Sequence, residues 1–187
     1  MSGNRRLLHT RHVVCQGFAL DNGLWEIEGR MSDLKSFAMR NPDRGGEIPL
    51  GEPLHDITLA LTLDAELRIH AVRVAMDATP FKSCAAITGA FQALKGLRLL
   101  PGFSRQAKEL LGGVKGCTHL LELLAPIATT AYQSLWQSEN GYNGDDPAVT
   151  GFLINSCHAL AEEGEVVQGM AAQLALPEEL ATRLVQG

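Results

Sequence analysis

Three cysteines and two histidines beyond residue 80 carry the side chains that a metal site needs. They are Cys84, Cys117, His119, Cys157 and His158. Thiolate and imidazole are ligands that zinc or iron takes from a protein, and five such groups exceed the four that close a tetrahedral zinc site. Their spacing is not that of paired CxxC motifs. The same residues therefore also fit a protein whose cysteines are small apolar side chains in the core.

Cys117 has the most favourable surroundings for chemistry. It follows the glycine-rich stretch GGVKG at 112–116 and precedes a predicted helix that Thr118 can cap. A helix N-terminus stabilises negative charge and Lys115 adds a positive charge, so we expect a thiolate that binds a metal or attacks an electrophile. Cys84 opens another predicted helix and gains the same advantage. Cys117 is therefore the candidate catalytic residue, and both cysteines are candidate metal ligands.

Basic side chains near Cys117 suggest a pocket for a small anionic molecule. The candidates are Lys115, Arg98 and Arg105. The stretch GGVKGCT lacks the Gly-Lys-Ser/Thr order of a nucleotide-binding phosphate loop. Ser104 does not lie in a nucleophile elbow, because Gln106 stands where the second glycine belongs. These motifs therefore predict neither a nucleotide-binding protein nor a serine hydrolase.

His55 and Asp56 are adjacent and have the side chains of an acid–base pair. Neighbouring residues of a strand point to opposite faces of the sheet, however, so the two side chains cannot face each other. His55, Ile57 and Leu59 are alternate residues of the segment 54–63, so their side chains point to the same face of the strand. We therefore predict that His55 is a hydrogen-bonded histidine of the core.

The elements that must position these residues change character at Pro80. Before it, apolar and polar residues alternate, and Asp21-Asn22-Gly23 has the composition of a hairpin turn. Strands are predicted at 12–19, 24–37, 54–63 and 67–77, with a proline- and glycine-rich loop at 40–53. After Pro80 the apolar period becomes that of a helix. Helices are predicted at 83–95, 103–111, 118–139, 147–160 and 177–186.

Strands followed by helices indicate the α+β fold class. We expect a four-stranded antiparallel sheet of two hairpins in the N-terminal half, covered on one face by the C-terminal helices. Pro126 should kink or break the helix at 118–139. A chain of 187 residues fits a single domain over 1–187 and can bury enough surface to need no structural metal. A bound metal would therefore be functional.

Composition excludes several classes of protein. The net charge is −5; residues 1–45 carry seven Lys or Arg against five Asp or Glu, and residues 137–187 carry one against eight. Without a strongly basic surface or a nucleic-acid-binding motif, no nucleic-acid partner is expected. The sequence has no apolar run long enough for a membrane span and no signal peptide, which predicts no membrane partner. Four scattered cysteines are typical of free thiols in a cytoplasmic protein.

Several motifs resemble those of a bacterial family of proteins with a domain of unknown function, number 2889 in that series. They are DNGLWEIEGRMSDLKSF, GEPLHD, LKGLRLLPGFSR, LLGGVKGCTHLLELL and NSCHAL, and the resemblance spans roughly residues 10–167. It implies no activity, because none is established for the family. The residues matching the family pattern are Cys84, Cys117, His119, Cys157 and His158, with Asp33, His55, Asp56 and Asp77 as further polar members.

The layout of residues 67–125 also resembles the U-type iron-sulfur cluster assembly scaffolds. In both, a strand leads to a cysteine that opens a helix, and a Cys/His pair opens a later helix. This sequence lacks the earlier cysteine of those scaffolds and places Cys117 before His119. The likeness implies a similar order of elements but not a shared function, because a shared fold does not fix a function.

Three functions are compatible with these observations. The first is a cytosolic scaffold or carrier that binds one zinc or iron ion through Cys84, Cys117 and His119, with Cys157 or His158 as the fourth ligand. The second is a small-molecule enzyme that uses Cys117 or a bound metal beside the anion pocket. The third is an interaction module with structural cysteines. The sequence does not determine the oligomeric state.

Overall fold

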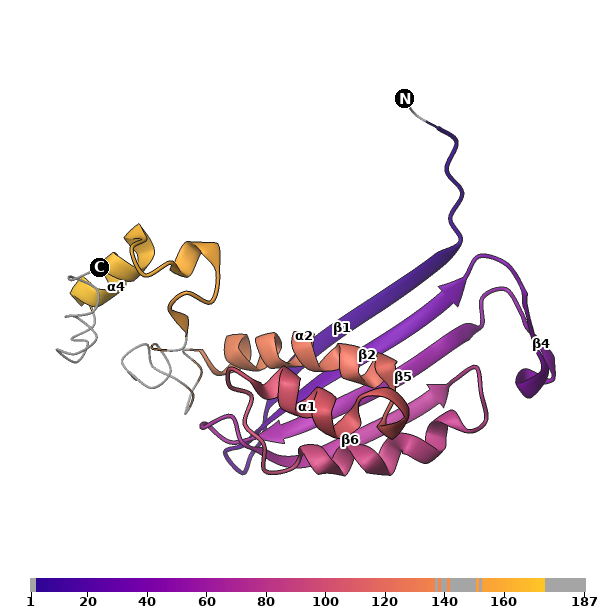
Figure 1. Ribbon diagram of the computed structural model, residues 1–187, viewed down its shortest axis with the longest axis horizontal. Helices are drawn as coiled ribbons and strands as arrows, with labels where there is room; N and C mark the ends of the chain where they lie inside the picture. The colour runs from indigo at the N-terminus through magenta and orange to yellow at the C-terminus, as the bar shows by residue number, and fades with distance from the viewer. Residues whose placement is uncertain (1–2, 137, 139–140, 142–150, 152, 174–187) are drawn as a thin grey trace. The chain divides into compact units, whose positions relative to one another are not determined.

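The structure of the protein is a computed structural model that describes residues 3–136, 138, 141, 151 and 153–173 (Figure 1). The chain forms two compact units, Met1–Gln133 and Ser134–Gly187. A single domain over 1–187 stays a prediction. The first unit contains both the sheet and the candidate site and is described first.

The predicted four-stranded antiparallel sheet is confirmed. Its strands are β1 (His9–Ala19), β2 (Trp25–Lys35), β5 (Pro53–Leu63) and β6 (Ile69–Ala78), and they lie in the order β1-β2-β5-β6. The first hairpin turns at Gly23, whose φ of 80° favours glycine. The amide of Leu24 donates to the side-chain oxygen of Asn22, which explains why Asn-Gly marks this turn.

The segment 40–53, predicted as a loop, contains a short hairpin. Its strands β3 (Met39–Asn41) and β4 (Gly46–Ile48) flank the 3₁₀ helix η1 (Pro42–Arg44). Gly45 and Gly46 both have positive φ values, 82° and 111°, which lets the chain reverse in so short a space. The prolines and glycines that suggested a loop are thus the residues of a tight turn.

Three of the predicted helices lie in the first unit. The segment predicted at 83–95 is a 3₁₀ helix, η2 (Cys84–Leu94), and the helix at 103–111 is α1 (Phe103–Leu111). A short η3 (Gly113–Lys115) leads into α2 (Thr118–Leu135), four residues shorter than the predicted 118–139. Pro126 does not break α2, which continues on both sides of it.

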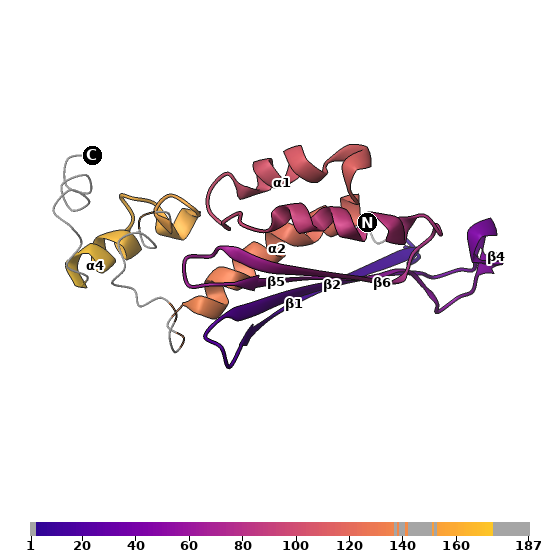
Figure 2. The same cartoon turned by 90° about the horizontal axis from the view of Figure 1, so that it is seen from below.

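The helices cover one face of the sheet, as predicted (Figure 2). Alternate residues of β2 and β5 point to this face and are fully buried, which explains the alternation in their sequences. The helices bury their apolar residues against them. The core includes Ile27, Met31, Ile57, Leu59 and Leu61 from the sheet, and Phe91, Leu94, Leu123 and Ile127 from the helices.

Gly29 brings α2 close to β2. A Cβ atom at Gly29 would lie 2.7 Å from Cγ1 of Ile127, which is fully buried, and 3.4 Å from Sγ of Cys15. Real Cβ atoms essentially never approach within 3.0 Å of another heavy atom. Only glycine therefore allows α2 to lie this near the sheet, and this close contact sets the height of the helix above the strands.

The second unit contains η4 (His158–Leu160) and α4 (Glu165–Gln173). Asn155 precedes them with a φ of 62°, and its side-chain oxygen accepts a hydrogen bond from the amide of Glu162. All of the helix predicted at 177–186, and residues 147–150 and 152 of the helix predicted at 147–160, lie outside the described residues. Over 154–160 the predicted helix is wrong, because turns and bends there lead into the short η4. None of the helices in the described part of the chain has the length and apolar character to cross a membrane.

Candidate functional site

The register of the sheet places three polar residues in one row on the helix-covered face. Arg11 of β1 pairs with Asp33 of β2, and Asp33 pairs with His55 of β5. Directly after this pair the register shifts, because Leu34 pairs with Pro53 and leaves one extra residue in β5. Such bulges re-aim side chains at the ends of strands. The row therefore lies where the regular ladder is interrupted.

Asp33 is the centre of the row, and its side chain is only 1% exposed. Its Oδ1 lies 3.0 Å from Nε2 of His9 and accepts from Nε of Arg11 at 2.8 Å. Its Oδ2 accepts from Nη2 of Arg11 at 2.8 Å and lies 2.8 Å from Nδ1 of His55. A carboxylate offers about four lone-pair sites, so all of those of Asp33 are engaged.

These partners keep Asp33 ionised despite its burial. Burial alone would raise its pKa, but the hydrogen bonds from Arg11 and His55 outweigh that effect and leave the pKa well below its usual range. The bidentate bond from Arg11 is the stronger kind of charged pair. A permanent negative charge is therefore held beneath the first turn of α2.

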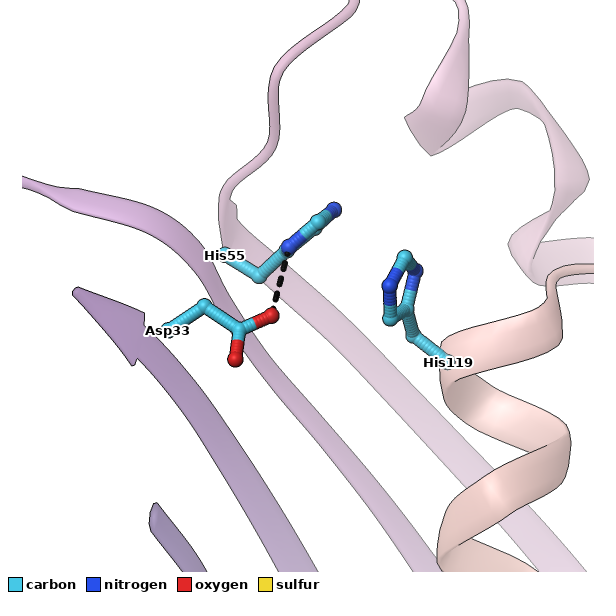
Figure 3. Close-up of side chains that lie close together, drawn as sticks. All are labelled: Asp33, His55 and His119. Carbon is cyan, nitrogen blue, oxygen red and sulfur yellow. Dashed lines mark hydrogen bonds and ion pairs between the residues drawn. The ribbon is translucent and has the colours of Figure 1, made fainter. Parts of the chain in front are cut away.

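His55 is oriented by Asp33 and is held in its neutral form. Burial lowers its pKa, the nearby His119 lowers it further, and Asp33 opposes both without reversing the shift. Nδ1 of a neutral His55 donates to Asp33, which leaves Nε2 with a lone pair. Figure 3 shows this second nitrogen on the side of the ring away from the carboxylate. The confirmed core histidine thus has one nitrogen available for chemistry.

His119, in the first turn of α2, brings a second imidazole to the site. The centroids of the two rings lie 4.0 Å apart, and the rings are tilted by 40° (Figure 3). One ligand atom each from Asp33, His55 and His119 lie within 4.8 Å of one another. These three residues form a group that can hold a metal ion.

The ion pairs continue from the sheet to α2. Nη1 of Arg11 donates to Oε2 of Glu122 at 2.6 Å, although the two residues are 111 positions apart. Glu122 lies one helical turn beyond His119, and its side chain is 47% exposed. Glu122 also lines a cavity of about 550 Å³ between α1 and α2. These contacts form one polar cluster that extends from the buried Asp33 to the surface and consists of His9, Arg11, Asp33, His55, His119 and Glu122.

The hydrogen bonds indicate which atoms are available to a metal. Asp33 has no lone pair left without breaking an existing bond, whereas His55 keeps Nε2. Histidine ligands of metals almost always donate their other N–H to a carboxylate or carbonyl, which fixes the tautomer. Asp33 and His55 have that arrangement. The atoms best placed to bind an ion are therefore the imidazole nitrogens of His55 and His119, with Asp33 as the orienting carboxylate.

The predicted cysteine ligands occupy separate positions in the fold. Cys84 begins η2 and is half-buried, and Cys117 immediately precedes α2 with its carbonyl accepting from the amide of Leu121 at 3.0 Å. Cys117 itself, and not Thr118, therefore occupies the N-cap position. Among the described residues, the group that can hold a metal contains no cysteine, and it shares only His119 with the predicted set. Ligation by Cys84 and Cys117 stays a prediction.

The other predicted site residues lie elsewhere. Cys157 and His158 are exposed and belong to the second unit. Lys115 donates to the carbonyl of Glu109, and Nε of Arg98 donates to that of Glu66. These residues and Arg105 do not line the cavity between α1 and α2. An anion pocket built from Lys115, Arg98 and Arg105 stays a prediction.

The sequence motifs do not predict the hydrogen bond between His55 and Asp33. Parity correctly placed His55 on the buried face, and the family resemblance included Asp33 and His55 among its polar members. The sequence does contain a pattern that indicates this partnership: Asp33 is spaced by even numbers of residues from Ile27 and Met31, which are buried, so it points to the same face of β2. A carboxylate at a core position needs partners, and these must come from neighbouring strands.

The cluster should make the protein sensitive to acid. The pKa of His55 is lower in the folded chain than its ordinary 6.5, so the unfolded chain takes up a proton first and stability falls as the pH drops below that value. The lowered pKa of Asp33 adds stability that is lost at still lower pH. We expect the urea midpoint to fall more between pH 7.5 and 5.0 for the natural chain than for His55→Gln. Equal falls would show that His55 does not cause the dependence.

Residues 9–133 match the model of a family of proteins of unknown function. The matched segment contains all six residues of the cluster and ends before Cys157 and His158. No significant match was found among curated proteins or among solved structures. The likeness to the U-type iron-sulfur scaffolds is therefore not supported.

Proposed function

Since the chain belongs to the DUF2889 family of proteins of unknown function, we propose a function from its site: the protein binds one divalent transition metal ion through His55 and His119. The observation that carries this proposal is the convergence of two imidazoles beside a buried, fully hydrogen-bonded carboxylate. Imidazole is a ligand suited to zinc and iron, and the proposed ion is one of these.

The charges of the cluster favour a cation. Asp33, Glu122 and Arg11 together carry one net negative charge, since two carboxylates face one guanidinium. The lowered pKa of His55 keeps its imidazole unprotonated, which is the form that binds a metal. An anionic ligand would meet this negative charge, whereas a divalent cation would be stabilised by it.

Two protein nitrogens leave several coordination positions open. A closed structural zinc site has four protein ligands, so this site fits a function in which the ion exchanges or meets a small molecule. A scaffold or carrier role in the cytosol uses such a site to deliver the ion. This role is supported by the partial exposure of His119 and by the cavity beside Glu122.

Metal binding is tested by titrating the purified, chelator-treated chain with Zn²⁺ in a calorimeter. We expect one ion per chain, and we expect His55→Ala and His119→Ala each to weaken binding by about 100-fold or more, since even outer partners of a metal site contribute 10–100-fold. His70→Ala is the matched control. His70 also pairs with an aspartate, Asp64 at 2.6 Å, but lies in an exposed pair on β6.

Three results would contradict the proposal. The first is a natural chain without stoichiometric binding, and the second is an affinity that His55→Ala and His119→Ala leave unchanged. The third is a loss of Zn²⁺ affinity in His70→Ala as large as in the two other variants, which would show that Zn²⁺ binds exposed histidines without preference for this site. Thermal melting without metal confirms that each variant is folded before titration.

An enzyme is the second candidate, because the Asp33–His55 pair is also the arrangement of a general base. A carboxylate that accepts from Nδ1 fixes the tautomer and leaves Nε2 to take a proton. Cys117, two residues before His119, is the predicted nucleophile for such a reaction. A chain that binds no Zn²⁺ in the titration would favour this second candidate, because a general base needs no metal.

A further inference from the structure

We propose that Glu122 is the third protein ligand of the metal site, so that His55, His119 and Glu122 form a two-histidine, one-carboxylate centre with Asp33 as its orienting carboxylate. This inference rests on the proposed function and specifies its ligand set. It differs from the simplest interpretation of the geometry, in which Asp33 binds the ion together with the two histidines.

Asp33 is a poor choice for the third ligand because of the bonds it already makes. Both of its oxygens accept two hydrogen bonds, from His9, Arg11 and His55. Binding an ion would break at least one of these bonds at a side chain that is 1% exposed. If the bond lost is the one to Nδ1 of His55, the orientation of that ring and the direction of its Nε2 are lost with it.

Glu122 has the freedom that Asp33 lacks. Among the described residues its side chain has one partner, Nη1 of Arg11, and it is 47% exposed. A half-exposed glutamate can change rotamer at little cost, and Arg11 would keep both of its bonds to Asp33. The existing ion pair can therefore exchange for a bond to a metal without disturbing the buried part of the cluster.

The spacing along α2 supports the same ligand. His119 and Glu122 are three residues apart, and residues at this spacing are neighbours on one face of a helix. Glutamate and histidine three residues apart bind a shared metal centre in the carboxylate-bridged helix bundles, although there the glutamate comes first and here the histidine does. Arg11 contacts both Glu122 and Asp33, so Glu122 is separated from the group of Asp33, His55 and His119 by one guanidinium. Its carboxylate is outside the set of ligand atoms that lie within 4.8 Å of one another and reaches the ion by a change of rotamer.

Two histidines and one carboxylate define the chemistry of the centre. This set leaves open positions for water or a small molecule and is used by non-haem iron(II) and by catalytic zinc. The cavity lined by Glu122, Thr118 and Lys108 adjoins the proposed ligand from the side of α1. A small molecule that enters there would contact Glu122, whereas neither histidine lines this cavity.

The test uses Co²⁺ as the probe, because its visible absorption reports the number and type of ligands. We expect Glu122→Gln to weaken Co²⁺ binding by about 100-fold or more and to change the spectrum at saturation. Asp33→Asn should weaken binding by about 10–100-fold, as outer partners do, with the natural spectrum kept at saturation. Glu109→Gln, an exposed residue of α1 with the same change of charge, should alter neither.

Each other outcome has a definite meaning. If Glu122→Gln weakens binding but keeps the natural spectrum, Glu122 acts only through its charge and the inference is wrong. If Asp33→Asn changes the spectrum and Glu122→Gln does not, Asp33 is the third ligand. If the natural chain binds no Co²⁺, or His55→Ala binds it equally well, the proposed function itself fails. Natural binding that requires both histidines but not Glu122 overturns this inference alone.

Discussion

Replacing Asp33 with asparagine is expected to lower the free energy of unfolding by about 3 kcal/mol. Removing one partner of a buried ion pair typically costs about 3–5 kcal/mol, because the remaining charge loses its compensation. The lower end applies here, since Arg11 is 35% exposed and reaches water. His55 also loses the acceptor for Nδ1. Urea denaturation at pH 7.5 measures the change.

The open face of the sheet provides a matched control for this substitution. Asp56 also accepts two bonds from an arginine, at 2.8 and 2.6 Å from Arg30, but this pair reaches water, since Arg30 is 57% exposed and Asp56 is 16% exposed against 1% for Asp33. Exposed pairs contribute little, so Asp56→Asn should leave the urea midpoint nearly unchanged. If the two variants lose equal stability, the burial of Asp33 is not what makes its charge important.

Replacing Gly29 with valine should cost about 3 kcal/mol, although valine is favoured in strands. The new Cβ would overlap Cγ1 and Cδ1 of Ile127, which is fully buried, so the Ile127 side chain or α2 itself must shift. Overpacking of this kind typically costs about 1–3 kcal/mol, and valine adds two further methyl groups. Since α2 carries His119, we also expect weaker Zn²⁺ binding in this variant.

Two further variants test whether the contact with Ile127 is the cause. Gly89 has no atom within 4 Å of its built Cβ, so Gly89→Val should be far less destabilising. Ile127→Ala removes the atoms that clash and leaves a cavity, which by itself costs about 2–5 kcal/mol. Gly29→Val should partly fill that cavity, so the double variant should lose less than the sum of the two. Simple additivity would count against the packing argument.

The sheet could be predicted from the sequence because its signals are local. The alternation along β2 and β5 and the Asn22-Gly23 turn each lie within a few residues. The short β3–β4 hairpin was missed because three-residue strands are too short to show alternation. The 3₁₀ character of η2 was also missed, since periodicity does not distinguish it from an α-helix over a single short segment.

The candidate site could be predicted only in part. The sequence predicts a role for His119 because it accompanies Cys117, and it predicts a core position for His55 because His55 lies on the same face of its strand as Ile57. Their meeting depends on the register across the 22 residues that separate Asp33 from His55, and on the height of α2 above the sheet. Neither the strand register nor the distance of α2 from the sheet can be predicted from a short stretch of sequence. Motif reasoning therefore favoured neighbouring Cys and His residues over partners that only the fold brings together.

The order of the cluster along the chain has a consequence for how the protein is made. His9, Arg11, Asp33 and His55 belong to the first three strands of the sheet, whereas His119 and Glu122 belong to α2, the last helix of the first unit. A chain leaving the ribosome can pair Asp33 with its strand partners while α2 is still being synthesised. The second imidazole arrives only when α2 docks on the sheet through long-range contacts, of which the ion pair between residues 11 and 122 is one. Capture of the proposed metal ion would then follow the docking of α2 and would protect the folded first unit from unfolding.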